Sequence, residues 1–242
     1  MCAFLFDVDD TIYDQMWPFR KAFDKCFKKY NNIPLEELFQ YSRKYSDEVF
    51  ELTESGELPL QEMHVYRITK AFEVYNIEIE KEEALNFQYT YEKHQKEIQL
   101  VPDVEKTFQY CKKNNIKIGI ITNGPELHQQ NKIDQLGLSR WISAENIFIS
   151  SKEKVSKPDK GIFEVAEKKM GLVSKDTYFI GDSFANDVTG AKNAGWRSIW
   201  INRRNKKIPD DLIQPDYVIK DGDSLLRLVL NLCEQKSELR FF

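Results

Sequence analysis

Several features that would place this chain in a special structural class are scarce or missing. The 242 residues contain four cysteines, whose spacing fits neither a disulfide framework nor a zinc site: Cys2, Cys26, Cys111 and Cys233. No apolar run is long enough to span a bilayer, and the first residues lack the basic and apolar regions of a signal peptide. We therefore expect a soluble, reduced protein of the cytoplasm that has no membrane partner.

Histidine and excess positive charge are also scarce. The three histidines, His64, His94 and His128, stand apart from any cysteine or carboxylate cluster, so we interpret them as residues on helix faces and not as zinc ligands. The net charge of −4 argues against a nucleic acid polymer as partner, because proteins that bind one usually carry a basic face. The basic stretches 152–160 and 203–207 are interpreted as solvated loops. The sequence leaves the oligomeric state open.

Short apolar runs separated by helical patterns fill most of the chain. One run ends at residue 6, and five more strand-like runs follow: 116–122, 147–150, 177–181, 198–201 and 216–219. Helical patterns lie between them, for example at 104–113, 161–169 and 187–194. This alternation predicts an α/β protein with a doubly wound, mostly parallel sheet and helices on both of its faces.

One long stretch contains helical patterns alone. Between residues 17 and 97, apolar stripes at 19–30, 35–52, 60–75 and 84–94 predict four helices. We therefore predict a core domain made of residues 1–15 and 99–242, and an all-helical cap domain at 16–98 inserted after the first strand. The apolar run 225–232 predicts a last helix, and no role is assigned to Phe241 and Phe242.

The first apolar run ends in carboxylates, and this feature is the most informative in the chain. Residues 4–11 read Phe-Leu-Phe-Asp-Val-Asp-Asp-Thr. Asp7 and Asp9 are two residues apart, so a strand would place both side chains on one side, where they repel each other unless a proton or cation intervenes. Mg²⁺ binds one or two carboxylates and completes its octahedron with water and phosphate oxygens. Helix capping would explain one Asp or Thr11, but not the whole string.

Polar residues also follow two later strands. The second run ends at Thr122 and Asn123, and the fourth leads into Asp182 and Asp187. Ligands of doubly wound sheets bind beyond the carboxyl ends of the strands, where the strand order reverses. If the first strand lies between the second and the fourth, these groups converge on Asp7.

In these residues the chain resembles the haloacid dehalogenase superfamily. The matching motifs occur in the expected order: Asp7-Val8-Asp9-Asp10-Thr11, Thr122-Asn123, Lys157-Pro158, and Gly181-Asp182-Ser183 with Asp187. The resemblance implies a Rossmann-like core with a helical cap. Asp9 is typical of the phosphatase branch, since the dehalogenase branch lacks this second aspartate. Details are similar to the pyrimidine 5′-nucleotidase and N-acylneuraminate-9-phosphate phosphatase subgroup.

The resemblance implies a catalytic role for each motif residue. Asp7 would attack phosphorus to form an aspartyl-phosphate, and Asp9 would act as general acid and then as general base. Thr122 and Asn123 would hold phosphoryl oxygens, and Lys157 would bind substrate and balance negative charge.

The resemblance also implies Mg²⁺ as the cofactor. Its ligands would be the Asp7 carboxylate, the Asp9 backbone carbonyl and Asp182. Asp187 would orient Lys157 or a metal-bound water. A simple N-cap remains the alternative interpretation of Asp187.

Three functions are compatible with the sequence. The first is Mg²⁺-dependent hydrolysis of a small phosphomonoester, such as a nucleoside monophosphate or a sugar phosphate. The second is a phosphomutase or phosphotransferase of the same superfamily, and the third is a non-catalytic phosphate-binding regulatory protein. Cap residues such as Phe19 and Arg67 could contact the leaving group, although packing within the cap is the favoured interpretation of both.

Overall fold

The computed structural model describes residues 2–209 and 213–238. The chain divides into two compact units, one formed by Met1–Asp14 with Gln99–Phe242 and the other by Gln15–Ile98. Phe241 and Phe242 lie outside the described residues. No helix in the described part of the chain is long and apolar enough to cross a membrane.

The larger unit is built on a six-stranded sheet in which every neighbouring pair of strands is parallel. Its strands, in chain order, are β1 (Ala3–Phe6), β2 (Lys117–Thr122), β3 (Ile147–Ile149), β4 (Thr177–Gly181), β5 (Arg197–Asn202) and β6 (Tyr217–Lys220). Their order across the sheet is β3-β2-β1-β4-β5-β6, so β1 lies between β2 and β4. The predicted doubly wound fold is confirmed, and the carboxyl ends of β1, β2 and β4 are neighbours at one edge.

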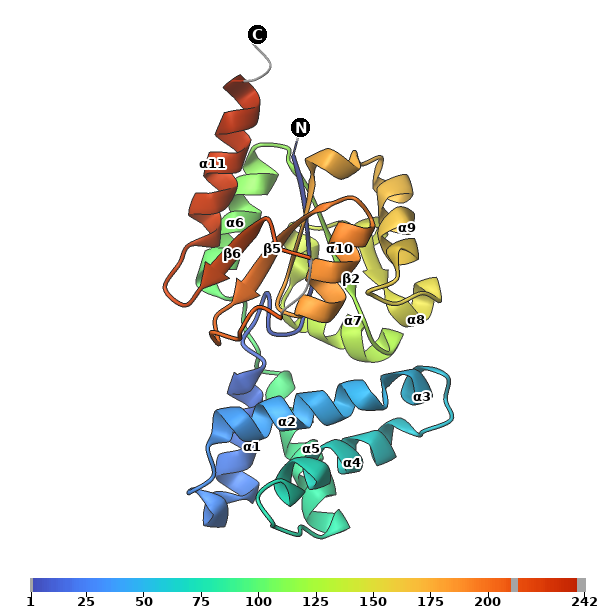
Figure 1. Cartoon of the computed structure of the whole chain (residues 1–242), viewed down its shortest axis with the longest axis vertical. Coiled ribbons are helices and arrows are strands. Elements are labelled where there is room, and N and C mark those ends of the chain that lie inside the picture. The colour runs from blue at the N-terminus through green and yellow to red at the C-terminus, as the bar shows by residue number, and fades with distance from the viewer. Residues whose placement is uncertain (1, 210–212, 239–242) are drawn as a thin grey trace. The chain divides into compact units, whose positions relative to one another are not determined.

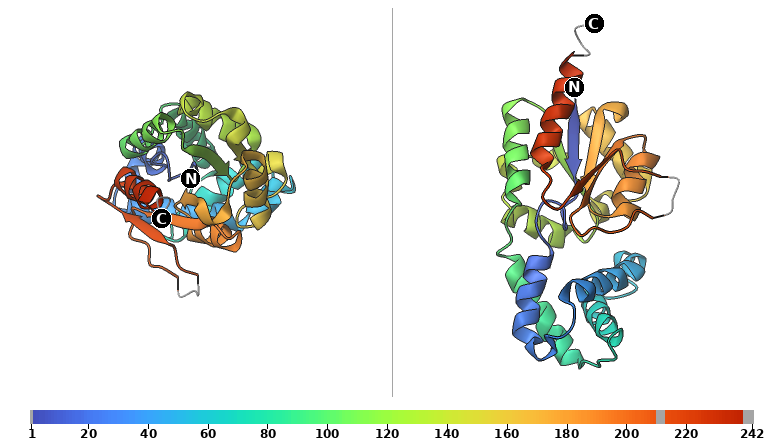
Figure 2. Two further views of the ribbon diagram at one scale, coloured as in Figure 1. Left: turned by 90° about the horizontal axis from the view of Figure 1, so that it is seen from above. Right: turned by 60° about the vertical axis from the view of Figure 1, so that its left-hand side comes forward.

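Helices cover both faces of this sheet (Figures 1 and 2). On one face α6 (Pro102–Lys113) lies beside α11 (Leu225–Glu238), and α9 (Lys160–Met170) and α10 (Thr189–Asn193) cover the other. The remaining helical segments of this unit are α7 (Glu126–Gln135), α8 (Ser150–Glu153), the π-helical turn η5 (Phe184–Val188), and the 3₁₀ turns η2 (Leu138–Arg140), η3 (Ala144–Asn146) and η4 (Ser174–Asp176).

An apolar layer holds α9 and α10 against the sheet. The ring of Phe163 on α9 is fully buried and packs edge-on against Phe179 of β4, with 5.1 Å between ring centroids. The same ring lies 5.3 Å from that of Trp196, just before β5. This packing fixes the segments that precede α9 and α10, which carry Lys157 and Asp187.

The smaller unit is entirely helical, as its apolar stripes predict. It contains α1 (Met16–Cys26), η1 (Lys28–Tyr30), α2 (Leu35–Glu48), α3 (Phe50–Glu54), α4 (Leu60–Glu73) and α5 (Lys81–Gln95). The stripe at 35–52 predicts one helix, but the helix is interrupted at Val49, whose φ of −110° and ψ of 14° leave the helical region. Leu52 is 45% exposed, so the end of this stripe has no core face to hold it in line with α2.

Aromatic rings form the core of the helical unit. Phe27 lies 4.7 Å from Phe72 and 5.3 Å from Phe87, between ring centroids, and all three are buried. Phe19 belongs to the same cluster. Arg67 is also buried, and its Nη2 donates to Gln88 Oε1 at 2.8 Å. Phe19 and Arg67 therefore both take part in packing within this unit.

Candidate active site

Asp7 is held at the end of β1 by backbone and side-chain contacts. Its backbone N–H donates to the carbonyl of Ile180 in β4 at 2.9 Å, which extends the β1–β4 pairing by one residue. Its carboxylate accepts from Lys157 Nζ at 2.7 Å on Oδ1 and from Thr11 Oγ1 at 3.4 Å on Oδ2. Burial raises the pKa of Asp7 to about 7, although nearby Lys157 acts in the opposite direction.

Lys157 joins two buried carboxylates. It is 4% exposed, and its Nζ donates to Asp7 Oδ1 and Asp187 Oδ1, both at 2.7 Å. Burial alone lowers the pKa of Lys157, but the charges of Asp187 and Asp7 outweigh burial and raise it above its ordinary value. Lys157 is thus a buried cation, so the solvated-loop interpretation of 152–160 is wrong at this residue.

Asp187 reaches this lysine because a glycine leaves room for it. Its carboxylate also accepts the backbone N–H of Ser183 at 2.9 Å, and the residue is 2% exposed. A Cβ on Gly181 would lie 2.2 Å from Asp187 Oδ2, a distance that only a glycine permits. The N-cap interpretation of Asp187 is wrong, because it lies within η5 and Ser183 is the N-cap, accepting from the N–H of Asn186.

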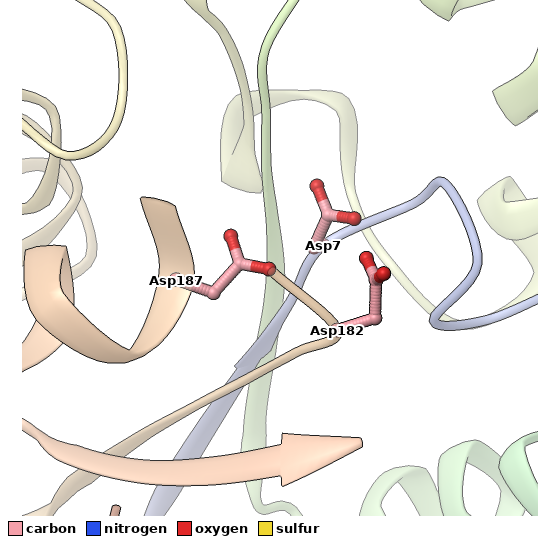
Figure 3. Close-up of side chains that lie close together, drawn as sticks. All are labelled: Asp7, Asp182 and Asp187. Carbon is pink, nitrogen blue, oxygen red and sulfur yellow. The ribbon is translucent and has the colours of Figure 1, made fainter. Parts of the chain in front are cut away.

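Three carboxylates meet at the carboxyl edge of the sheet (Figure 3). One oxygen from each of Asp7, Asp182 and Asp187 lies within 4.8 Å of the other two. Burial, followed by the charge of Asp10, raises the pKa of Asp182 to about 8, although Lys206, 3.3 Å from its Oδ2, acts in the opposite direction. Asp7 and Asp187 are buried and Asp182 is half-buried, and this concentration of oxygen ligands and negative charge fits a divalent metal ion.

The second motif contributes a hydroxyl and a structural amide. Thr122 is 1% exposed, and its Oγ1 makes no hydrogen bond to any described residue. A buried hydroxyl in this state is costly, which favours a ligand that accepts its proton. The side chain of Asn123 pairs with the backbone of Lys157, donating to its carbonyl at 2.8 Å and accepting from its N–H at 2.9 Å. This pairing joins the second motif to the third.

Asp9 lies in a different environment from Asp7. Lys132 Nζ is 2.7 Å from both oxygens of its carboxylate, and Gln129 Nε2 donates to Oδ2 at 3.0 Å. The hydroxyl of Tyr13 donates to Oδ1. The carboxylate of Asp9 is therefore bound by donors from α7 and from Tyr13.

The basic loop after β5 is not a solvated segment throughout. Arg204 forms two hydrogen bonds with the carboxylate of Asp10, at 2.8 and 2.7 Å, and lies 3.3 Å from Asp14. Arg203 Nη2 donates to the carbonyl of Thr11 at 3.2 Å. The solvated-loop interpretation of 203–207 is wrong for these two arginines, because Arg204 pairs with the Asp10 carboxylate and Arg203 donates to a backbone carbonyl of the first motif.

Sequence reasoning missed the partners of Asp9 and Asp10. Gln129 and Lys132 lie three residues apart on α7 and hence on one helix face, a spacing that is common on solvated helices. Arg204 is separated from Asp10 by 194 positions, and no local pattern connects them. The three histidines lie on α4, α5 and α7, and within residues 2–209 and 213–238 they join no group of potential metal ligands.

A family model and curated relatives match this chain in sequence. The model of the haloacid dehalogenase-like hydrolases matches residues 1–195. A glyceraldehyde 3-phosphate phosphatase of Pyrococcus furiosus is 34% identical over 132 residues, which are 53% of this chain and 54% of the relative. The pyrimidine 5′-nucleotidase YjjG of Escherichia coli is 31% identical over 118 residues, 48% of this chain and 51% of the relative. The matches thus span about half the length of these curated relatives.

Solved structures match over nearly the whole chain. YfnB from Bacillus subtilis, a HAD-type protein solved with bound magnesium, is 25% identical, with a TM-score of 0.69 and coverage of 96% of this chain and 98% of that one. A HAD phosphatase from Thermococcus onnurineus is also 25% identical, with a TM-score of 0.59 and the same coverage.

Proposed function

Because this chain belongs to the haloacid dehalogenase-like hydrolases, we propose that it is a Mg²⁺-dependent phosphomonoesterase that acts on a small phosphorylated metabolite. One observation carries the proposal: buried Lys157 bridges Asp7 and Asp187 at 2.7 Å, with Asp182 in the same carboxylate cluster. The match over residues 1–195 confirms the family resemblance that the four motifs indicated.

In the proposed reaction Asp7 is the nucleophile. One of its carboxylate oxygens attacks phosphorus, the bond from phosphorus to the ester oxygen breaks, and Asp9 gives its proton to the departing alkoxide. Asp9 then removes a proton from a water molecule, which attacks phosphorus and releases inorganic phosphate. The second step restores the Asp7 carboxylate and the protonated Asp9.

The transferring phosphoryl group is held by donors from the second and third motifs. The unpartnered hydroxyl of Thr122 and the backbone N–H of Asn123 donate to phosphoryl oxygens. Lys157 offsets the negative charge on the nucleophile and the phosphate. Asp187 keeps Lys157 in place through the 2.7 Å ion pair and is itself fixed by the N–H of Ser183.

We propose that the metal ion is held by the Asp7 carboxylate, Asp182 and the backbone carbonyl of Asp9. When bound, Mg²⁺ supplies positive charge that offsets the repulsion between an anionic nucleophile and an anionic phosphate. The all-oxygen donor set and the raised pKa of Asp182 support such an ion.

The substrate class is proposed from the relatives and from the helical unit. The similar proteins named above are phosphatases of a sugar phosphate and of pyrimidine nucleotides. We propose that residues 15–98 are a cap domain, the kind of insertion that favours small substrates over phosphoproteins.

A panel of phosphomonoesters tests this proposal. The purified protein is incubated with nucleotides and sugar phosphates, with Mg²⁺ or with EDTA, beside Asp7→Asn and the exposed control Asp134→Asn. We expect phosphate release that requires Mg²⁺, disappears in Asp7→Asn and persists in Asp134→Asn. In ¹⁸O-labelled water the released phosphate carries solvent oxygen, whereas a phosphomutase gives isomerised product. A folded protein that releases no phosphate from any compound contradicts the proposal.

A further inference from the structure

The carboxylate of Asp182 contacts a lysine that the proposed reaction does not use. Lys206 Nζ lies 3.3 Å from Asp182 Oδ2, and the side chains of Lys206 and Asp182 are 42% and 20% exposed. Lys206 belongs to the loop that follows β5, whereas Asp182 follows β4, and these two strands are neighbours in the sheet. A cation from the chain itself therefore lies beside one of the proposed metal ligands.

β5 fixes the backbone on both sides of this ion pair. The side chain of Asn202, the last residue of β5, accepts from the N–H of Lys206 and donates to its carbonyl, both at 2.8 Å. Trp200, also on β5, donates from Nε1 to the carbonyl of Asp182 at 2.9 Å. Asn202 and Trp200 are 5% and 1% exposed, so buried groups hold the backbones of Lys206 and Asp182 in place. The fold thus keeps Lys206 within reach of Asp182.

Lys206 is held less firmly than Lys157, the buried lysine of the same carboxylate cluster. The side chain of Lys157 is 3% exposed, and its Nζ contacts Asp7 and Asp187 at 2.7 Å. The contact of Lys206 with Asp182 is longer, and its side chain is partly in water. Its ammonium group can therefore move into solvent at a small cost in free energy, whereas that of Lys157 cannot.

We infer that Lys206 competes with the divalent cation for Asp182 and so weakens the binding of Mg²⁺. The inference rests on the proposed function, in which Asp182 holds the metal ion. When Mg²⁺ binds to Asp182, either the ion pair with Lys206 breaks or a single and a double positive charge come close together. Both changes cost free energy and make metal binding weaker. Lys206 acts through Asp182, so it is a positioning residue and not a catalytic one.

The same contact stabilises the protein when no divalent ion is bound. Asp10, Asp187 and Asp7 act on Asp182 as like charges, and Lys206 offsets part of their repulsion. Loss of Lys206 should therefore lower the melting temperature in EDTA and increase the stabilisation that Mg²⁺ provides, because a ligand that binds the folded state more tightly stabilises it more. A purely structural role would change stability without changing the affinity for the metal ion.

The variants separate the ion pair from the net charge of the loop. Lys206→Met removes the charge at similar length, and Lys206→Arg keeps a cation. Lys207→Met is the matched control, because Lys207 is the next residue of the same loop, is exposed, and its replacement changes the net charge by the same amount. Asp182→Asn shows whether the measured binding belongs to this site.

Two measurements without substrate test the inference. Titration calorimetry with Mg²⁺ gives the Kd, and thermal unfolding with EDTA or with saturating Mg²⁺ gives the melting temperature. The buffer is at pH 9, above the pKa of Asp182 of about 8, so that protons compete little with the metal ion.

We expect Lys206→Met to lower the Kd for Mg²⁺ about fivefold, the size expected for a partly exposed ion pair. Lys206→Arg should bind Mg²⁺ no more tightly than the wild type, and Lys207→Met should stay within about twofold of it. In EDTA, Lys206→Met should melt at a lower temperature than Lys207→Met, and Mg²⁺ should raise its melting temperature more. Asp182→Asn should lose most of the binding.

The alternative outcomes are distinguishable. A Kd for Lys206→Met that equals that of Lys207→Met, or that exceeds the wild-type value, would overturn the role of Lys206 while leaving the proposed function intact. A folded wild type that binds no Mg²⁺, or an Asp182→Asn variant that binds it as tightly as the wild type, would overturn the metal site of the proposed function, and this inference with it.

Discussion

Buried charges at single residues define this site. Asp7, Asp9 and Asp187 are each paired with a buried lysine, through Lys157 or Lys132. Neither lysine is solvated, and each would leave an uncompensated carboxylate if removed. Negative charge remains concentrated around Asp7 and Asp182. This charge favours the binding of a cation and lowers the stability of the fold when no cation is bound.

The Asp187 side chain occupies the space that Gly181 leaves by having no side chain. Replacing Gly181 by Ala places a Cβ 2.2 Å from Asp187 Oδ2 and 2.6 Å from its Cβ, so the Asp187 side chain has to move away. We expect Gly181→Ala to lower kcat at least 10-fold, since Lys157 loses its second carboxylate, and to lower the melting temperature. Steady-state kinetics and calorimetry measure both effects. Val173→Ala, at a position that is 54% exposed, is the control for expression and handling, and wild-type activity in Gly181→Ala would contradict the expected role of this space.

We expect the buried Tyr178 on β4 to make the free energy of unfolding fall at alkaline pH. Burial raises the pKa of Tyr178 to about 12, above the ordinary value of about 10. The folded state therefore favours the neutral phenol, and the resulting stabilisation is complete below about pH 10 and is lost as the pH rises towards 12. Urea unfolding at pH 8 and pH 11 measures this loss. We expect a smaller decrease in the free energy of unfolding for Tyr178→Phe than for the wild type, and equal decreases would exclude Tyr178 as the cause.

At the scale of elements, the order of three strands assembles the site. β1 delivers Asp7, β2 delivers Thr122, and β4 leads to Asp182, and these strands are neighbours in the parallel sheet. Alternation of strand and helix predicts this layout, because parallel strands end at one edge. The face of α7 that meets Asp9 could not be predicted, since it depends on how the helix packs and not on its own sequence.

We expect the fold to lose much of its stability when the aromatic contact between α9 and the sheet is removed. Phe163 is fully buried between Phe179 and Trp196, so Phe163→Ala should reduce the free energy of unfolding by about 3–5 kcal/mol. Urea unfolding followed by circular dichroism measures the change. Val173→Ala, at a position that is 54% exposed, is the control and should change stability by less than about 0.5 kcal/mol. A similar small change for Phe163→Ala would mean that this layer does not hold α9.

At the scale of the whole molecule, two of the hydrophobic clusters formed by the described residues each lie within a single unit. One contains the aromatic cluster of the helical unit, and the other joins the sheet to α9 and α10. The sequence predicts a helical insertion because 17–97 lacks strand patterns. It could not predict the break at Val49, whose backbone leaves the helical region between α2 and α3.

The two cores predict local unfolding within one unit. Phe72 is fully buried and contacts Phe27 and Tyr30, at 4.7 and 5.4 Å between ring centroids. We expect Phe72→Ala to accelerate amide hydrogen exchange in residues 15–98 by at least 10-fold while the strands of the other unit keep their protection. Mass spectrometry of peptides measures this, with Tyr89→Ala, at a 71% exposed position, as the control. Equal acceleration in β1 and β4 would show that the two cores unfold together.

The central claim is that Asp7 becomes covalently phosphorylated, and the Asp9→Asn variant offers its most direct test. With p-nitrophenyl phosphate and Mg²⁺, the leaving group departs without an acid, but the variant lacks the base that hydrolyses the intermediate. We predict a burst of one nitrophenolate per protein molecule and a phosphoryl group on the peptide that contains Asp7, detected by mass spectrometry after acid quenching. Wild-type turnover combined with equal release of nitrophenolate and phosphate by Asp9→Asn, or a phosphoryl group on another residue, would contradict it.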